Sequence, residues 1–293
     1  MSFYDRIEKS FDNACRLPLS EKSRYVVFSD CHRGTGKAND NFLKNENIYM
    51  AALQYYYTRG FTYIELGDGD ELWENRSFED IKEMHWRVFD ILARYYRENR
   101  FVGIYGNHDM VKRSERFVRR NMAEYYCENA MCSHELFPDA TFYPAAILDD
   151  NLNRKNIYLT HGHQADVLNS TLWRVSRFLV RYLWQPLEDL GVPDPTSAAK
   201  NNTKKKKSEQ RLTEWAQINK NILITGHTHH PMVGTPTSPY FNTGSCVSPS
   251  GITCIEIEKR CLTLYKWSYS TRQDMTVYVA KSVLGERVCI DEY

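Results

Sequence analysis

The chain reads Phe101-Val102-Gly103-Ile104-Tyr105-Gly106-Asn107-His108-Asp109, an apolar run that stops at a polar turn. A short apolar run bounded by such a turn is typical of a buried strand. Residues 25–28 and 61–66 have the same form, and helical spacing of apolar residues fills the intervals at 43–58 and 78–97. This strand–helix alternation predicts an α/β sheet with right-handed crossovers.

The second half of the chain changes its pattern. Further strands are predicted at residues 142–148, 157–160 and 222–225. Beyond Pro231 no helical pattern separates the strands, which are predicted at residues 252–257, 262–267 and 275–279. We therefore expect a second, largely antiparallel sheet packed face to face on the first. Residues 268–293 should add only a strand or two to a single domain that spans residues 1–293.

Polar side chains of one kind follow five of these strands. They are Asp30 and His32, then Asp68, then Asn107 and His108, then His161, and last His227 and His229. Sites in open α/β sheets form just outside the carboxyl ends of the strands. We therefore expect these side chains to meet at one edge of the sheet.

The residue types in this set are those of a metal site. A carboxylate can bridge two cations, and imidazole nitrogens with an amide oxygen can complete each coordination shell. A mixed set of nitrogen and oxygen ligands favours manganese, iron, zinc or cobalt over calcium or magnesium. The set contains no thiolate, which argues against a closed structural zinc site. Two ions roughly 3.5–4 Å apart would hold a hydroxide nucleophile and phosphate oxygens.

The order of these motifs resembles that of the calcineurin-like metallophosphoesterases. The matching motifs are Asp30-x-His32, Gly67-Asp68, Gly106-Asn107-His108-Asp109, His161 and Gly226-His227-Thr228-His229, so the resemblance extends from Tyr25 to Trp267. It implies a four-layer αββα sandwich, in which two packed mixed sheets are flanked by helices. It also implies two divalent metal ions, manganese first and iron, zinc or cobalt as alternatives. The implied reaction is hydrolysis of a phosphoester or pyrophosphate bond by a metal-bridging hydroxide.

The resemblance also implies a role for each residue. The first metal would be held by Asp30, His32 and His229, the second by Asn107, His161 and His227, with Asp68 as the bridge. His108 would act on the substrate as a general acid or transition-state donor, oriented by Asp109. The family's second acidic residue, three positions after the bridge, is Glu71 here. Because Asp70 lies beside it, either residue could orient a ligand.

Residues 164–220 are expected to form a helical insertion that acts as a lid. Between 168 and 183 the apolar residues share one helical face, while Arg174, Arg177 and Arg181 form a separate stripe. Such a basic, aromatic-rich helix can lie on a membrane surface or cover the site of an anionic substrate. We expect these three arginines to contact substrate. Arg33 is either a further phosphate ligand or a solvated loop residue.

Within the family there is a weaker resemblance to the UDP-2,3-diacylglucosamine hydrolases. The segment Gly67-Asp68-Gly69-Asp70-Glu71-Leu72-Trp73 and the long insertion are similar to theirs, but those enzymes usually carry Arg at the position of His108. Activity like that of a UDP-sugar-lipid pyrophosphatase is therefore one alternative. Others are a protein or small-molecule phosphomonoesterase and a nucleotide phosphodiesterase. A membrane-associated scaffold with a vestigial site is the alternative outside enzymology.

The composition sets broad limits on compartment and partners. The 293 residues carry a net charge of only +1, so charge indicates no specific nucleic-acid partner. The first ten residues lack an apolar signal region, and the eight cysteines form no Cys-x-x-Cys pair. We therefore expect reduced cysteines and a cytoplasmic enzyme, with peripheral membrane contact through residues 168–184. The substrate is expected to be a phosphorylated small molecule, nucleotide-linked or lipid-linked. The lysine run at 204–207 is expected in a solvated loop.

Overall fold

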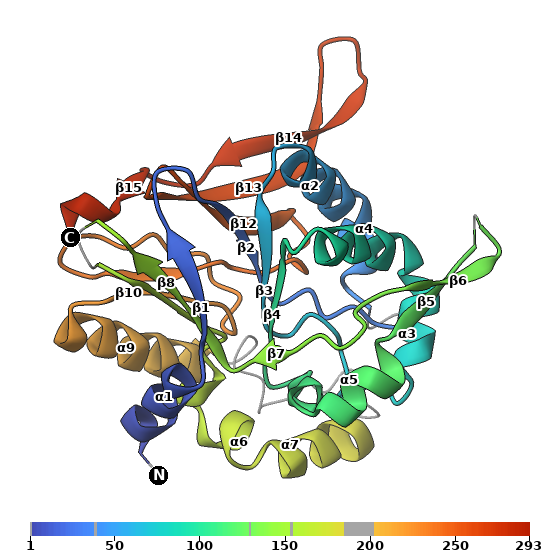
Figure 1. The fold of residues 1–293 in the computed structure, drawn as a ribbon, viewed down its shortest axis with the longest axis horizontal. Helices are drawn as coiled ribbons and strands as arrows, with labels where there is room; N and C mark the ends of the chain where they lie inside the picture. Colours follow the sequence, from blue (N-terminus) through green and yellow to red (C-terminus); the bar gives the residue numbers. More distant parts are fainter. Residues whose placement is uncertain (1, 38–39, 129, 153–154, 185–201) are drawn as a thin grey trace.

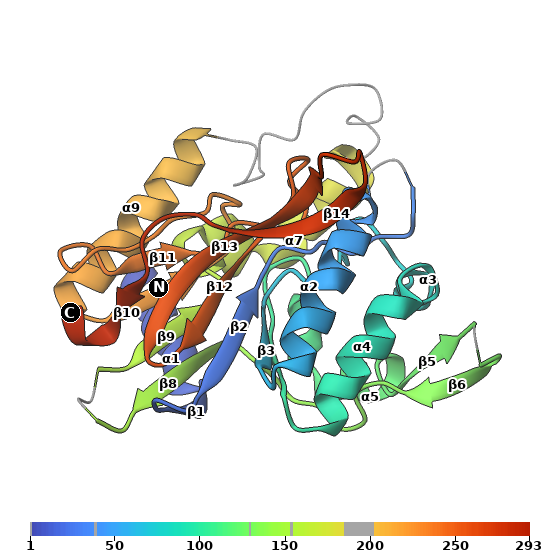
Figure 2. The same ribbon diagram turned by 90° about the horizontal axis from the view of Figure 1, so that it is seen from above.

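The computed structural model describes residues 2–37, 40–128, 130–152, 155–184 and 202–293. Two β-sheets lie face to face between helices, as the two views in Figures 1 and 2 show. The larger sheet has the order β14-β13-β12-β2-β3-β4-β7, with β15 paired to β13, and the smaller has the order β1-β8-β9-β10-β11. Both sheets are mixed. The predicted fold of two packed mixed sheets flanked by helices is confirmed.

The strands of the larger sheet are β2 (Arg24–Phe28), β3 (Thr62–Leu66), β4 (Phe101–Ile104), β7 (Phe142–Tyr143), β12 (Ile252–Glu258), β13 (Cys261–Thr271), β14 (Val277–Val283) and β15 (Val288–Cys289). Those of the smaller sheet are β1 (Cys15–Leu19), β8 (Ala145–Asp150), β9 (Ile157–Thr160), β10 (Ile222–Thr225) and β11 (Tyr240–Asn242). A separate hairpin consists of β5 (Glu124–Cys127) and β6 (Cys132–Glu135).

Three apolar layers hold the sandwich together. Between the sheets, Val27 and Ile64 of the larger sheet share a cluster with Leu159 and Ile224 of the smaller one. The outer face of the larger sheet packs against α2 (Glu46–Thr58) and α4 (Trp86–Arg97), and that of the smaller sheet against α1 (Phe3–Asp12) and α9 (Asn202–Asn219). Since burial of apolar surface drives folding, these layers fix the two sheets relative to each other.

The antiparallel strands after Pro231 do not form a second sheet, and that prediction is wrong. β12 pairs antiparallel with β2, so β12, β13 and β14 extend the sheet that begins with β2, β3 and β4. The second sheet is instead assembled from β1 and the middle of the chain. Alternation along a strand reports burial and does not identify the neighbouring strand, so sheet membership was decided by tertiary contacts.

Two predicted elements are each divided in the structure. The helix expected over 78–97 is two helices, α3 (Phe78–Met84) and α4, which are separated by the buried His85. The strand expected over 142–148 is β7 and β8, which lie in different sheets on either side of Pro144. Proline has no backbone N–H to donate to a ladder, which suits the point where the chain leaves one sheet for the other.

The insertion is also divided. Residues 168–183 form α6 (Val167–Ser170), α7 (Trp173–Leu179) and η4, a π-helical turn over Val180–Trp184. The lysine run at 204–207 lies in α9 and not in a loop. Because α9 packs on the smaller sheet, it is not available as a lid, and of the described part of the insertion only residues 164–184 keep that predicted role. Residues 185–201 of the predicted insertion lie outside the described residues.

Two further observations concern cysteines and membranes. A disulfide joins Cys261 and Cys289, so the prediction that all cysteines are reduced is wrong for this pair. Among the described residues, no helix has both the length and the apolar composition needed to cross a membrane.

Candidate metal centre

The predicted ligands lie on turns with an uncommon backbone conformation. Asp30, His32, Asp68, His227 and His229 all have positive φ, between 47° and 68°. Non-glycine residues rarely adopt this left-handed conformation, and such residues cluster at functional sites. The turns follow β2 and β3 in the larger sheet and β10 in the smaller sheet. The sequence had suggested a site along the edge of one sheet, but the site forms between the two sheets.

Glycines in the motifs let these turns approach closely. A Cβ atom on Gly106 would lie 2.1 Å from Asp68 Oδ1, and one on Gly226 would lie 2.4 Å from Asp30 Oδ2. Neither distance is sterically possible, so both positions need glycine. The Gly-Asn-His and Gly-His-Thr-His motifs thus have a packing reason for their first residue.

One group of predicted ligands is formed by Asp30, His32 and His229. His229 Nε2 lies 3.1 Å from Asp30 Oδ1 and 3.3 Å from His32 Nε2. One ligand atom from each of the three lies within 4.8 Å of the other two. This is the trio that the resemblance assigned to the first metal.

A second group contains Asp68, His161 and His227, with ligand atoms again within 4.8 Å of one another. His161 Nε2 lies 3.0 Å from Asp68 Oδ2, and the same oxygen lies 3.8 Å from His32 Nε2 of the first group. Asp68 therefore lies between the two groups, as a bridging ligand would. Asn107 is buried. It lies beside Asp68, since the backbone N–H of the next residue, His108, donates to Asp68 Oδ1 at 2.8 Å.

Unpaired atoms in these groups supply a test of whether metal ions fit. Asp30 Oδ1, Asn107 Oδ1, His161 Nε2 and His227 Nε2 are buried and form no well-directed hydrogen bond among the described residues, although Asp30 Oδ1 and His161 Nε2 lie 3.1 Å and 3.0 Å from His229 Nε2 and Asp68 Oδ2. A buried polar atom without a partner costs free energy. These four atoms come from four different turns, and all are nitrogen or oxygen atoms that can donate a lone pair. The donor set therefore fits divalent metal ions of the kind that the sequence predicted.

Burial and charge set the protonation of these groups. Burial, with the neighbouring His161, lowers the pKa of His227 to about 3, so this imidazole is neutral and its nitrogen lone pair is free to ligate. Burial opposes charge on His161 as well, but the carboxylates of Asp68 and Asp30 outweigh it and raise its pKa to about 9. Burial also opposes ionisation of Asp30, yet the imidazoles of His229 and His161 hold its pKa well below the usual range. Asp30 is therefore anionic at neutral pH, as a metal ligand would need to be.

Glu71, not Asp109, orients His108. Glu71 Oε1 lies 2.8 Å from His108 Nδ1, and Oε2 lies 2.8 Å from His32 Nδ1. One carboxylate thus holds both a predicted metal ligand and the predicted catalytic histidine. The ring of Trp73 stacks on His108 with centroids 4.3 Å apart. The sequence contained a signal for this role, since Glu71 lies three positions after Asp68, but it left Glu71 and Asp70 as equal candidates.

Asp109 has a different role from the predicted one. Its carboxylate accepts hydrogen bonds from the backbone N–H groups of Gly106 at 2.7 Å and Gly69 at 3.1 Å, and it binds Lys112 Nζ at 2.7 Å. Within the described part of the chain, the Asp109 carboxylate forms no hydrogen bond or ion pair with the imidazole of His108, whose Nδ1 contacts Glu71 instead. Asp109 therefore holds together the two turns that carry Asp68 and Asn107.

Arg33 fits neither of the two expectations for it. Its side chain is 1% exposed and binds Asp70 Oδ1 at 2.6 Å and Glu65 Oε2 at 2.8 Å. Lys112 joins the same cluster through Asp70. Buried charges persist in proteins when they are paired in this way. Arg33 is thus part of a buried ion cluster beneath the site, neither solvated nor free to bind phosphate.

Several hydrogen bonds around the predicted ligands could not be predicted from the sequence. The carbonyl of Leu66 accepts a hydrogen bond from His161 Nδ1 at 2.9 Å, which leaves Nε2 as the ligand atom. Ser29 donates a short hydrogen bond to Asp30 and contacts Thr243 at 2.6 Å. His163 is also buried next to His161.

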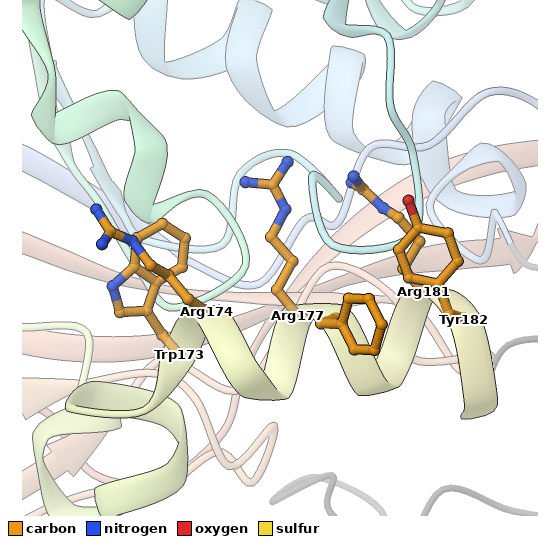
Figure 3. Close-up of a pocket in the computed structure, with 6 residues that line it drawn as sticks. Trp173, Arg174, Arg177, Arg181 and Tyr182 are labelled. Atoms are coloured by element: carbon orange, nitrogen blue, oxygen red, sulfur yellow. The ribbon is translucent and has the colours of Figure 1, made fainter.

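The three arginines of the insertion face the site loops. Arg181 donates to the carbonyls of Leu72, Trp73 and Asn75 at 2.8–2.9 Å, so it anchors the insertion on the loop that follows Glu71. Arg174, Arg177 and Arg181 line an open pocket of about 300 Å³ together with Trp173, Phe178 and Tyr182 (Figure 3). Several apolar residues of the predicted apolar face are exposed instead of buried, namely Leu168, Leu172, Val175 and Tyr182. The insertion thus turns its basic side toward the protein.

Comparison with known proteins gives a family. No curated protein matches the chain. Among solved structures, a mutant of a cold-active protein tyrosine phosphatase is 13% identical with a TM-score of 0.40, and the match covers 90% of this chain and 83% of that one. Chaetomium thermophilum Vps29 is 11% identical with a TM-score of 0.39, over 90% of this chain and 97% of its own. The model of the calcineurin-like phosphoesterases matches residues 23–231, the segment that carries all seven predicted ligands, and the chain belongs to that family.

Proposed function

We propose that this protein hydrolyses a phosphoester or pyrophosphate bond with two divalent metal ions. One observation carries the proposal: six of the seven predicted ligands lie in two compact groups, and four buried atoms of the seven, one of them Asn107 Oδ1, form no hydrogen bond among the described residues. Asp30, His32 and His229 would hold one ion, Asn107, His161 and His227 the other, and Asp68 both. Such ions lower the pKa of bound water toward about 7 and neutralise charge on phosphate oxygens.

His108 is the residue proposed to act on the leaving group. Its side chain is 21% exposed, so a substrate can reach it, while Glu71 holds Nδ1 at 2.8 Å. With Nδ1 bound to a carboxylate, the other ring nitrogen is available to the substrate. His108 can then donate a hydrogen bond or a proton to the oxygen that departs from phosphorus.

The proposal is tested with manganese-loaded protein and two chromogenic substrates, p-nitrophenyl phosphate and bis-p-nitrophenyl phosphate. We expect about two manganese ions per chain and turnover of at least one substrate. Asp68→Ala and His227→Ala should abolish turnover while the circular dichroism spectrum stays unchanged. Glu83→Gln, an exposed carboxylate on α3, is the matched control. Near-normal activity in either ligand variant would refute the assignment.

The metal, substrate and compartment are also proposals. Manganese is our first choice of metal, with iron, zinc and cobalt as alternatives, and metal analysis of the purified protein decides between them. The candidate substrates are phosphomonoesters of proteins or small molecules, nucleotide phosphodiesters and UDP-sugar-lipid pyrophosphates. We propose a cytoplasmic enzyme that meets a membrane, if at all, through residues 168–184. A scaffold with a vestigial site would bind no metal and turn over none of these substrates.

A further inference from the structure

The side of the insertion that faces the protein carries a cluster of arginines. Arg174 and Arg177 line the pocket of Figure 3, and their side chains rise from α7 toward the site loops. Arg113, from the turn after Asp109, places its guanidinium 5.6 Å from the ring centre of Trp173. Arg76, from the loop after Glu71, lies 5.2 Å from the ring centre of Tyr182. The pocket itself is lined by the insertion, and these two contacts bring the guanidinium groups of Arg113 and Arg76 beside two of its lining rings.

None of these four arginines is paired with an acidic residue that the structure describes. No ion pair joins Arg76, Arg113, Arg174 or Arg177 to a carboxylate within the described parts of the chain. Elsewhere buried or half-buried arginines of this protein are paired, as Arg33 and Arg260 are. Arg177 is half-buried, and burial together with the adjacent Arg181 lowers its pKa. A guanidinium that is partly desolvated and next to another cation is stabilised by a bound anion.

Arg181 differs from the others, because three of its five N–H donors are already used. Its Nε and one terminal nitrogen donate to three backbone carbonyls, so it positions the loop of Trp73. The anion-binding capacity of the pocket therefore resides mainly in Arg174 and Arg177, which line it, with Arg113 and Arg76 next to its rings Trp173 and Tyr182. Arginine binds phosphate with a planar pair of donors, and aromatic rings such as Trp173 stack on its guanidinium.

We infer that this pocket is a second phosphate subsite, so that the substrate carries another phosphate group besides the one at the metal ions. The inference rests on the proposed function for the first phosphate. The substrate class is a soluble oligophosphate, such as a pyrophosphate- or triphosphate-bearing small molecule. A plain phosphomonoester, whose one anionic group would lie at the metal ions, would bring no second anion to Arg174 and the half-buried Arg177.

The experiment measures binding of inorganic tripolyphosphate to the metal-free protein by isothermal titration calorimetry. We expect the wild type to bind it, and Arg174→Gln/Arg177→Gln to bind at least about tenfold more weakly, because charge-assisted hydrogen bonds are lost. Arg174→Lys/Arg177→Lys keeps the charge and should recover part of the affinity. Arg272→Gln/Arg287→Gln removes two exposed arginines from the region of β14, far from α7 in Figure 1, and should bind like the wild type. If the Gln double variant does not fold, Arg113→Gln removes the guanidinium beside Trp173 and should also weaken tripolyphosphate binding.

The possible failures are distinguishable. Tripolyphosphate binding that is absent in the wild type, or unchanged in the Gln double variant, overturns the subsite, while turnover of p-nitrophenyl phosphate keeps the proposed function. Binding that depends on these arginines without any turnover supports the subsite and overturns the function. If Arg174→Gln/Arg177→Gln no longer sediments with phosphatidylglycerol vesicles but binds tripolyphosphate like the wild type, the arginines bind a membrane and the inference is overturned.

Discussion

Glu71 is the residue whose replacement tests the site most sharply. Glu71→Gln keeps the shape of the side chain but removes its charge. In the structure, Oε1 serves His108 and the backbone N–H groups of Trp73 and Glu74, while Oε2 serves His32. A glutamine has one acceptor oxygen and one NH2 group, so at least one imidazole N–H would face another donor.

The expected effect follows from the number of bonds lost. A hydrogen bond to a charged group contributes about 1.5–3 kcal/mol, which corresponds to about 10- to 150-fold in an equilibrium or rate constant. Replacing a carboxylate that orients a metal ligand typically costs about 10–100-fold in metal affinity or activity. If the amide turns its nitrogen to His32, metal affinity should fall by that factor. If it turns its nitrogen to His108, kcat at saturating metal should fall instead.

Both quantities can be measured on the same protein. Manganese titration of the metal-free variant gives the affinity, and kcat with p-nitrophenyl phosphate at saturating manganese gives the catalytic effect. Glu83→Gln makes the same chemical change on an exposed helical face and should alter neither quantity. Changes below about threefold in both quantities would refute the role that we assign to Glu71.

Three further predictions concern the surroundings of the site. Lys112→Met should lower the free energy of unfolding by about 3–5 kcal/mol in urea titrations, because Asp109 and its two neighbouring carboxylates lose a buried counter-charge; a loss below about 1 kcal/mol would contradict this. His85→Gln should destabilise the fold by about 3 kcal/mol at pH 6 and by less at pH 9. Burial opposes the charged form of His85, but Asp40 and Glu46 outweigh it and raise the pKa of His85. The stabilisation from the charged imidazole is therefore complete below pH 6.5, the unfolded-state pKa, and is lost as the pH rises through the higher folded-state pKa. Equal losses of stability at pH 6 and pH 9 would contradict this prediction. Arg181→Gln should speed hydrogen exchange of the amides at residues 71–77 and leave β3 unchanged, and unaltered exchange in that loop would show that Arg181 does not anchor it.

The sequence by itself indicated the strands and the candidate ligand residues, because both are encoded locally. The run before Asp68 is mostly apolar, with Phe61, Tyr63, Ile64 and Leu66, and it ends at a Gly-Asp turn, a pattern that favours a buried strand. The glycines beside the ligands follow the same logic, since Gly106 and Gly226 allow two turns to approach within van der Waals range. The family and the general architecture could therefore be predicted from residues and their order.

Tertiary structure alone decided how these pieces meet. Whether β12 joins β2 or founds another sheet depends on which neighbour its backbone groups pair with, and alternation of side chains leaves that choice open. Likewise, charge and spacing could not tell Glu71, which holds His108, from Asp70, which is paired with Arg33 beneath the site. Adjacent residues on a turn point in different directions, so a difference of one position separates an orienting carboxylate from a buried structural one. Burial and hydrogen-bond partners, which come only from the folded chain, make that distinction.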